Sequence, residues 1–127
     1  MQTIANGRIA AMTPWGEVLG AEGVEQVVSH VRRLSGQDHD AALATAGETQ
    51  FQTFCAACHG LDGKGMAAVG APNLTDDVWL YGGDADTIRE TVVKGRMGQM
   101  PAFQDSLGEQ RVRLLAAYAL KLSEGAQ

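Results

Sequence analysis

A Cys-x-x-Cys-His motif, Cys55-Ala56-Ala57-Cys58-His59, constrains this chain more than any other feature, because it holds the only two cysteines among 127 residues. With both cysteines in one short segment, no disulfide framework can hold the fold together. On a helical turn, two thiols three positions apart can each bond one vinyl group on the same edge of a macrocycle. The next side chain, an imidazole, then lies under the iron. The motif therefore predicts one covalently attached haem c with His59 as an iron ligand.

Two other chemistries use cysteines at this spacing. A thioredoxin-like dithiol expects a strand–helix–strand context, which the sequence does not show. A zinc site needs about four ligands, so His30 or His39 would have to join the motif. The adjacent Cys58 and His59 are poorly placed to bind one ion together. We expect His30 and His39 to be surface residues, with bis-histidine ligation of haem by one of them as a further alternative.

A second iron ligand is offered by Met100, in the segment Gly98-Gln99-Met100-Pro101. A thioether opposite His59 gives His/Met ligation, which raises the reduction potential of the haem. Six-coordinate iron has no open position, so the site is predicted to carry electrons and not to act as an enzyme. Pro101 fixes the backbone directly after the ligand.

The chain contains a repeat with a constant offset of 88 residues. Gly7 matches Gly95 (95 − 7 = 88), and Met12 matches Met100 (100 − 12 = 88). The apolar positions of an amphipathic helix repeat at the same offset, namely Val24, Val27, Val28, Val31 and Leu34 against Val112, Leu115, Ala116, Ala119 and Leu122.

The repeat predicts three parts: a partial module at 1–36, a linker at 37–40 and a complete module at 41–127. The partial module lacks a haem-attachment motif, so Met12 is expected to be a vestigial ligand with nothing to bind. The apolar face of the 24–34 helix has lost its partners, and we expect it to dock on the complete module or on another chain.

Local signals outline the elements of the complete module. Asp40 is expected to cap a helix that runs toward Cys55, with Thr45 and Glu48 as a second capping option. Residues 60–73 form a glycine-rich loop, and Thr75 begins a short turn through residues 79–81. A helix opened by Asp84 stops at Gly95, and a capping box at Ser106 and Glu109 begins a last helix to about Ser123. No strand signal competes, so the fold class is all-α.

Composition excludes some partners. The net charge is −5 and no Lys/Arg block stands out, so nucleic-acid binding is not expected. No apolar run approaches the ~18 to 20 residues that span a bilayer, and no signal peptide is visible. We therefore expect a soluble chain without direct membrane insertion, whose acidic surface could steer it toward a basic patch on a partner.

Haem-pocket residues follow from position in the chain. Donors for the propionates are expected from Arg96, Trp79 and Gln99. The walls of the macrocycle site are expected from Leu74, Tyr81, Val92 and Phe103. His59 should donate its other ring N–H, which fixes its tautomer.

Longer segments resemble a known family. They are Gly70-Ala71-Pro72-Asn73-Leu74-Thr75-Asp76, Trp79-Leu80-Tyr81-Gly82-Gly83, Gly95-Arg96-Met97-Gly98-Gln99-Met100-Pro101 and Leu114-Leu115-Ala116-Ala117-Tyr118. Together they resemble the C-terminal cytochrome domain of the dihaem subunit of cbb(3)-type cytochrome c oxidases. Residues 6–20 resemble the end of that subunit's first cytochrome domain.

The resemblance implies a class I cytochrome c fold, in which the Pro72 carbonyl accepts from His59. It implies electron relay to a terminal cytochrome c oxidase in aerobic respiration, with oxidase catalytic subunits or another cytochrome as redox partners. It implies the periplasmic side of a bacterial inner membrane, reached through the oxidase complex.

Other functions stay open. One is a free-standing monohaem cytochrome that serves another periplasmic partner. A gas sensor or peroxidase is the alternative if Met100 is not a ligand, and a module in which haem only stabilises the fold is a third. Homo-oligomerisation through the 24–34 helix is an option in each case.

Overall fold

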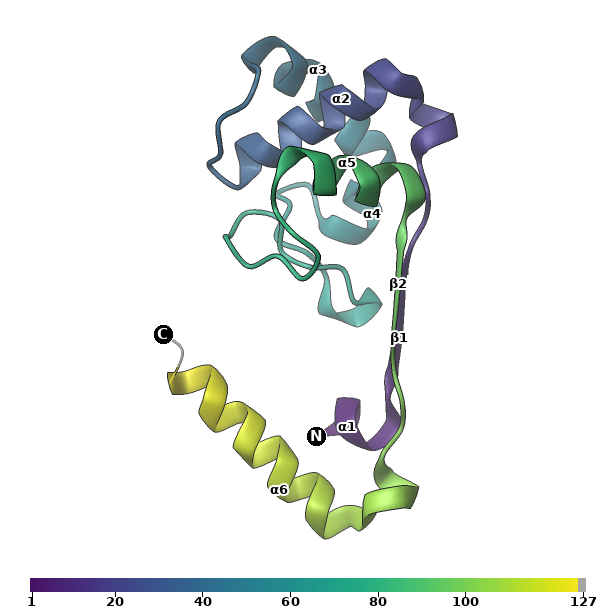
Figure 1. The fold of residues 1–127 in the computed structure, drawn as a ribbon, viewed down its shortest axis with the longest axis vertical. Helices are drawn as coiled ribbons and strands as arrows, with labels where there is room; N and C mark the ends of the chain where they lie inside the picture. The colour runs from purple at the N-terminus through teal and green to yellow at the C-terminus, as the bar shows by residue number, and fades with distance from the viewer. Residues whose placement is uncertain (126–127) are drawn as a thin grey trace. The chain divides into compact units, whose positions relative to one another are not determined.

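The computed structural model describes residues 1–125, and they are mostly helical (Figure 1). In chain order the elements are α1 (Gln2–Asn6), β1 (Arg8–Met12), α2 (Gly16–Leu34), α3 (Ala41–Phe54), α4 (Ala56–His59), the 3₁₀ helix η1 (Ala67–Val69), α5 (Ala85–Lys94), β2 (Arg96–Met100) and α6 (Gln104–Gly125). The helical class matches the expectation from sequence.

The chain forms two compact units. One contains residues 11–96, and the other contains residues 1–10 together with the segment that starts at residue 97. These units have other boundaries than the modules expected from the repeat (1–36, 37–40 and 41–127), and the last two residues of the third module, 126–127, lie outside the described part of the chain. The difference arises because α2 packs with α3 and α5, whereas α6 packs with α1.

The core of the 11–96 unit lies between α2, α3 and α5. Its buried members are Val24, Val27, Val28, Val31, Phe51, Cys55, Ile88 and Val92. Burying one valine of this kind stabilises the fold by about 1.5–3 kcal/mol. The predicted docking of the 24–34 helix on the rest of the chain is therefore confirmed.

Two helices of this unit begin with the expected caps. The Asp40 side chain accepts from the Leu43 N–H at 2.9 Å, and the Asp84 side chain accepts from the Thr87 N–H at 2.9 Å. Each carboxylate satisfies a backbone donor that the first helical turn leaves unpaired.

The segment 60–83 is irregular apart from η1. The short turn expected after Thr75 is not helical, because local side chains take its backbone donors. Asn73 Oδ1 accepts from the Thr75 N–H at 2.9 Å, and Asp76 Oδ1 accepts from the Val78 N–H at 3.1 Å. Such side-chain bonds offer the backbone an alternative to helix.

Within the other unit, α6 packs on α1 and is kinked at Gly108, which has φ 76° and ψ 161°. The helix begins at Gln104, so the capping box expected at Ser106 and Glu109 is not its start. The Ser106 hydroxyl instead donates to the Phe103 carbonyl at 3.2 Å. Much of the helix surface is apolar and exposed: Leu114, Leu115, Tyr118, Leu120 and Leu122 are all accessible.

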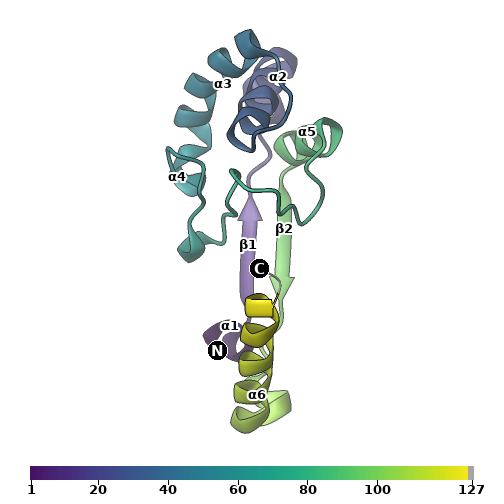
Figure 2. The same cartoon turned by 90° about the vertical axis from the view of Figure 1, so that its left-hand side faces the viewer.

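The strands β1 and β2 pair in a two-stranded sheet and run in opposite directions (Figure 2). The sequence did not predict them, because neither segment alternates β-branched or aromatic residues with polar ones. Glycines precede both strands in the same unusual conformation. Gly7 has φ 68° and ψ 179°, and Gly95 has φ 69° and ψ −179°.

Candidate functional site

The Cys-x-x-Cys-His motif lies where α3 gives way to α4. Cys55 ends α3 and precedes α4, and His59 is the last residue of α4. The His59 N–H donates to the Cys55 carbonyl at 2.9 Å, so the motif forms one closed helical turn. Cys55 and His59 are buried, whereas Cys58 is exposed. Two thiols and one imidazole therefore lie within this turn.

His59 has a fixed orientation. Its Nδ1 lies 3.2 Å from the Pro72 carbonyl oxygen, which is the hydrogen bond that the sequence led us to expect. A carbonyl only accepts, so Nδ1 carries the proton and Nε2 keeps its lone pair. Burial lowers the pKa of His59, and the hydrogen bond to Pro72 opposes that shift. The neutral imidazole that results is the form that binds a metal.

The environment of Cys55 does not favour a reactive thiolate. Burial, together with a smaller effect of the neighbouring Cys58, raises the pKa of Cys55 to about 11. Catalytic dithiols instead have lowered thiol pKa values in electropositive surroundings. The site is thus unlike a dithiol oxidoreductase centre.

The loop after the motif folds back against it through backbone hydrogen bonds. The Gly65 N–H donates to the His59 carbonyl at 2.8 Å, and the Leu74 N–H donates to the Gly63 carbonyl at 2.7 Å. A Cβ at Gly65 would overlap the backbone of Pro72, and Gly65 has φ 83°, so glycine is required at this approach. The close packing holds the Pro72 carbonyl beside His59.

The residues of this unit fit a haem in their chemistry. They supply two thiols at vinyl spacing and an imidazole with a free Nε2. The segment 61–81 also holds many large apolar side chains that are exposed: Leu61, Met66, Val69, Val78, Leu80 and Tyr81. A flat apolar macrocycle could cover such a surface.

Comparison with known proteins agrees with this chemistry. Residues 42–118 match the model of the family described as cytochrome c oxidase, cbb3-type, subunit III, which is more than half of the chain. The chain belongs to this family. It is a cytochrome c domain, and its helical structure is consistent with the all-α class I cytochrome c fold.

Curated relatives carry the corresponding names. The cbb3-type cytochrome c oxidase subunit CcoP of Cereibacter sphaeroides is 51% identical over 108 residues, which are 85% of this chain and 37% of the relative. CcoP of Rubrivivax gelatinosus is 40% identical over 97% of this chain and 40% of the relative. Subunit FixP of Azorhizobium caulinodans is 39% identical over 94% of this chain and 41% of the relative. The chain thus spans about two fifths of the length of these relatives.

In this cbb3-type cytochrome domain, five of the expected pocket residues contribute to the packing of the 11–96 unit. Val92 is a buried member of its apolar core, and Leu74 and Trp79 pack against that core. The Arg96 guanidinium lies over the Tyr81 ring, 4.2 Å from its centroid, and Arg96 Nε donates to Thr91 Oγ1 at 3.0 Å. Arg96 is therefore held in place beside the loop that follows the motif.

The remaining expected residues fall in the other unit. Gln99, Met100 and Phe103 belong to the unit with α6, whereas His59 belongs to the 11–96 unit. Met12, which sequence reasoning set aside as vestigial, lies in the unit that holds His59. The 88-residue repeat pairs Met12 with Met100 in sequence, and only the fold shows that Met12 shares a unit with His59.

The two other histidines differ in exposure. His39 is exposed, as expected, but the expectation for His30 is wrong, because it is 4% exposed. Its ring packs on Phe51 with centroids 5.0 Å apart, and Nδ1 lies 2.9 Å from an Arg33 guanidinium nitrogen. Among residues 1–125, no group of three or more His, Cys, Asp or Glu side chains could hold a metal ion.

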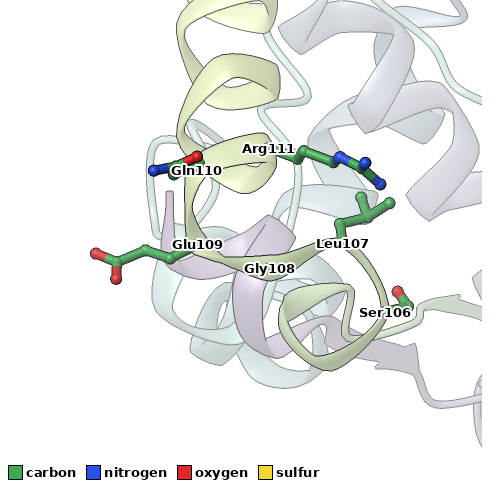
Figure 3. Close-up of a pocket in the computed structure, with 6 residues that line it drawn as sticks. All are labelled: Ser106, Leu107, Gly108, Glu109, Gln110 and Arg111. Carbon is green, nitrogen blue, oxygen red and sulfur yellow. The ribbon is translucent and has the colours of Figure 1, made fainter.

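Two surface hollows lie in the unit that contains α6. One is at the kink of α6 and is lined by Ser106, Leu107, Gly108, Glu109, Gln110 and Arg111 (Figure 3). The other is a mainly apolar groove between α1 and α6. Neither contains a residue expected to bind haem. None of the helices in the described residues is long and apolar enough to cross a bilayer.

Proposed function

We propose that this chain is an electron-carrying cytochrome domain with one covalent haem c. The observation that carries the proposal is the arrangement at His59: a buried imidazole, fixed by Pro72, that follows two free thiols on one helical turn. Membership of the cbb3-type oxidase subunit family supports it.

In the proposed site, Cys55 and Cys58 would hold the macrocycle through thioether bonds, and His59 Nε2 would bind the iron. Met100 would offer a thioether to the iron. Haem supplies a reversible one-electron couple, and the protein sets its potential through the axial ligands and the surroundings. The Pro72 carbonyl keeps His59 in the metal-binding tautomer.

The remaining pocket residues are proposed to orient and shield the macrocycle. Arg96, Trp79 and Gln99 would bind the propionates. Leu74, Tyr81, Val92 and Phe103 would exclude water, which strengthens electrostatic interactions around the iron. With both axial positions filled, the domain would transform no substrate.

We further propose that the domain passes electrons to a terminal oxidase. The relatives are named as subunits of such an oxidase, which supports oxidase catalytic subunits or another cytochrome as redox partners. The proposed location is the periplasmic side of a bacterial inner membrane, within the oxidase complex. The net charge of −5 supports a basic docking surface on the partner and argues against nucleic acid.

The homo-oligomer proposed from sequence needs a different surface from the one expected. The apolar face of α2 is buried within the chain, so the 24–34 helix could join two copies only by leaving its own core. A soluble relative serving another periplasmic partner remains the second candidate.

The decisive measurement is the intact mass of the chain made in cells that attach haem c, followed by spectroscopy. We expect one haem per chain, a reduced spectrum unchanged by carbon monoxide, and a weak near-infrared thioether-to-iron band when oxidised. The C55S/C58S variant is the control and should carry no covalent haem. Rapid carbon monoxide binding would replace the electron-carrier proposal with a gas-binding or peroxidase function.

A further inference from the structure

The two repeats contact each other in a reciprocal way. The Trp15 N–H donates to the Val92 carbonyl at 2.9 Å, and the Phe103 N–H donates to the Ile4 carbonyl at 3.0 Å. Trp15 is equivalent to Phe103 in the repeat (15 + 88 = 103), and Ile4 is equivalent to Val92 (4 + 88 = 92). The two bonds therefore join the same pair of repeat positions, with donor and acceptor taken from opposite repeats.

The glycines before the strands obey the same rule. A Cβ at Gly95 would overlap the Met12 carbonyl, and a Cβ at Gly7 would overlap the Met100 carbonyl. The kinks also correspond, since Gly20 has φ 66° and ψ 174° where Gly108 has φ 76° and ψ 161°. Such reciprocity is the signature of element exchange between two similar halves, as in domain-swapped dimers.

The exchange places α2 in the position that the repeat assigns to α6. Within one undivided module, Phe103 would bond to Val92, and α6 would pack on α3 and α5. In the structure Trp15 and α2 take these contacts instead. The apolar face of α6 is left largely exposed, with Leu115 at 43%, whereas the equivalent Val27 is at 1%.

A charge pair favours α2 over α6 in this position. Glu25 of α2 accepts from Arg89 of α5, with Arg89 Nη2 3.0 Å from Glu25 Oε2 and Arg89 Nε 2.5 Å from Glu25 Oε1. The residue of α6 equivalent to Glu25 is Arg113 (25 + 88 = 113). Docking α6 would therefore set one guanidinium against another, which is unfavourable.

We propose that α2 and α6 are alternative occupants of one docking site on α3 and α5, and that Met12 becomes the sixth haem ligand when α2 is docked, as Met100 does when α6 is docked. This rests on the proposed function, since it requires haem on Cys55, Cys58 and His59. Met12 precedes α2 by the same interval at which Met100 precedes α6, and it lies in the same compact unit as His59.

The test identifies the ligating methionine directly. The full chain with covalent haem is labelled at the methionine methyl carbons, reduced, and observed by nuclear magnetic resonance, where the iron-bound methyl group is strongly shifted by the macrocycle. In the parent chain we expect Met12→Leu to remove most of this signal and Met100→Leu to leave it. Signal lost only in Met100→Leu overturns the proposal.

Charge reversal then tests the competition. Arg89→Glu removes the pair with Glu25 and offers Arg113 a partner, so the fraction ligated by Met100 should rise by about two- to ten-fold. Adding Glu25→Arg to that variant should restore ligation by Met12. Arg111→Glu makes the same charge change at the kink of α6 and should shift nothing. If the fraction of chains ligated by Met100 is the same in the parent and in all three variants, the proposed competition is wrong.

Two further measurements distinguish a failure of the proposed function from a failure of the exchange within one chain. A chain without covalent haem, or with haem but no ligated methyl group, contradicts the proposed function itself. Sedimentation shows whether exchange occurs within one chain. A ligated Met12 found only in a dimer would overturn the intrachain exchange, and a monomer with ligated Met12 supports it.

Discussion

Gly47 of α3 lies directly against Gln26 of α2, so closely that a Cβ at Gly47 would overlap the Gln26 carbonyl oxygen. The helix pair at the centre of the 11–96 unit depends on this absence of a side chain. Helix backbones approach this closely only at small residues, and Gly47 also borders the buried His30.

Replacing Gly47 with alanine should lower the free energy of unfolding by about 1–3 kcal/mol, because the extra methyl group forces α2 and α3 apart. The better helix propensity of alanine offsets part of this cost. Denaturant unfolding measures the change. Gly98→Ala, at a position with open space around it, is the control. Equal stability of the two variants would show that the helices do not pack this closely.

The Glu25–Arg89 pair should make stability depend on pH. The hydrogen bond from Arg89 lowers the pKa of Glu25 below its ordinary value of about 4.3. A lowered folded pKa means that the contribution is present above the unfolded pKa and is lost as pH falls through the folded one. The Glu25→Gln variant should therefore be less stable than the parent at neutral pH and match it in acid.

The measurement is denaturant unfolding of both chains at neutral pH and at about pH 3. Both side chains are partly exposed, so the difference should be small and should shrink at high salt. Glu109→Gln is the control, because its partner Arg113 lies on the same helix. A difference that persists in acid would point to packing as its source.

Removing the Arg96 charge should lower the reduction potential of the haem. A guanidinium held beside the site disfavours the extra positive charge of the oxidised iron, and Arg96 is fixed by Tyr81 and Thr91. Arg96→Gln, measured by redox titration of the loaded chain, should therefore shift the midpoint downward. Arg111→Gln is the matched control. Identical potentials would place Arg96 away from the haem.

Loss of the Asp40 cap should destabilise α3. Asp40→Ala removes the acceptor for the Leu43 N–H, at a cost of about 1 kcal/mol in the free energy of unfolding. Asp40→Asn keeps an acceptor and should recover most of that loss. If both variants are equally unstable, charge near the helix start, and not the hydrogen bond, is responsible.

The sequence predicted those parts of the structure that short-range residue patterns determine. The motif at Cys55, the caps at Asp40 and Asp84 and the apolar face of α2 each depend on a few neighbouring residues. Burial of His30 could also have been predicted, since it lies three residues from Val27 and four from Leu34 on that same face.

The choice between α2 and α6 could not be predicted, because the repeat gives both helices the same apolar pattern. Local sequence patterns therefore do not discriminate between α2 and α6. Tertiary contacts, such as the pair of Glu25 with Arg89, do. The division of the predicted pocket residues between two compact units follows from that choice. The positions of Gln99, Met100 and Phe103 relative to His59 stay a prediction.

The docking of α2 also bears on how the chain reaches its native state. Residues 35–40 alone separate α2 from α3, so the central helix pair is a local hairpin, whereas α6 could reach α3 only after the loops and α5 had been ordered. Chains rich in contacts that are close in sequence fold faster. During synthesis α2 and α3 also emerge before α6 exists. The order of the elements thus gives α2 a kinetic advantage, apart from any difference in affinity.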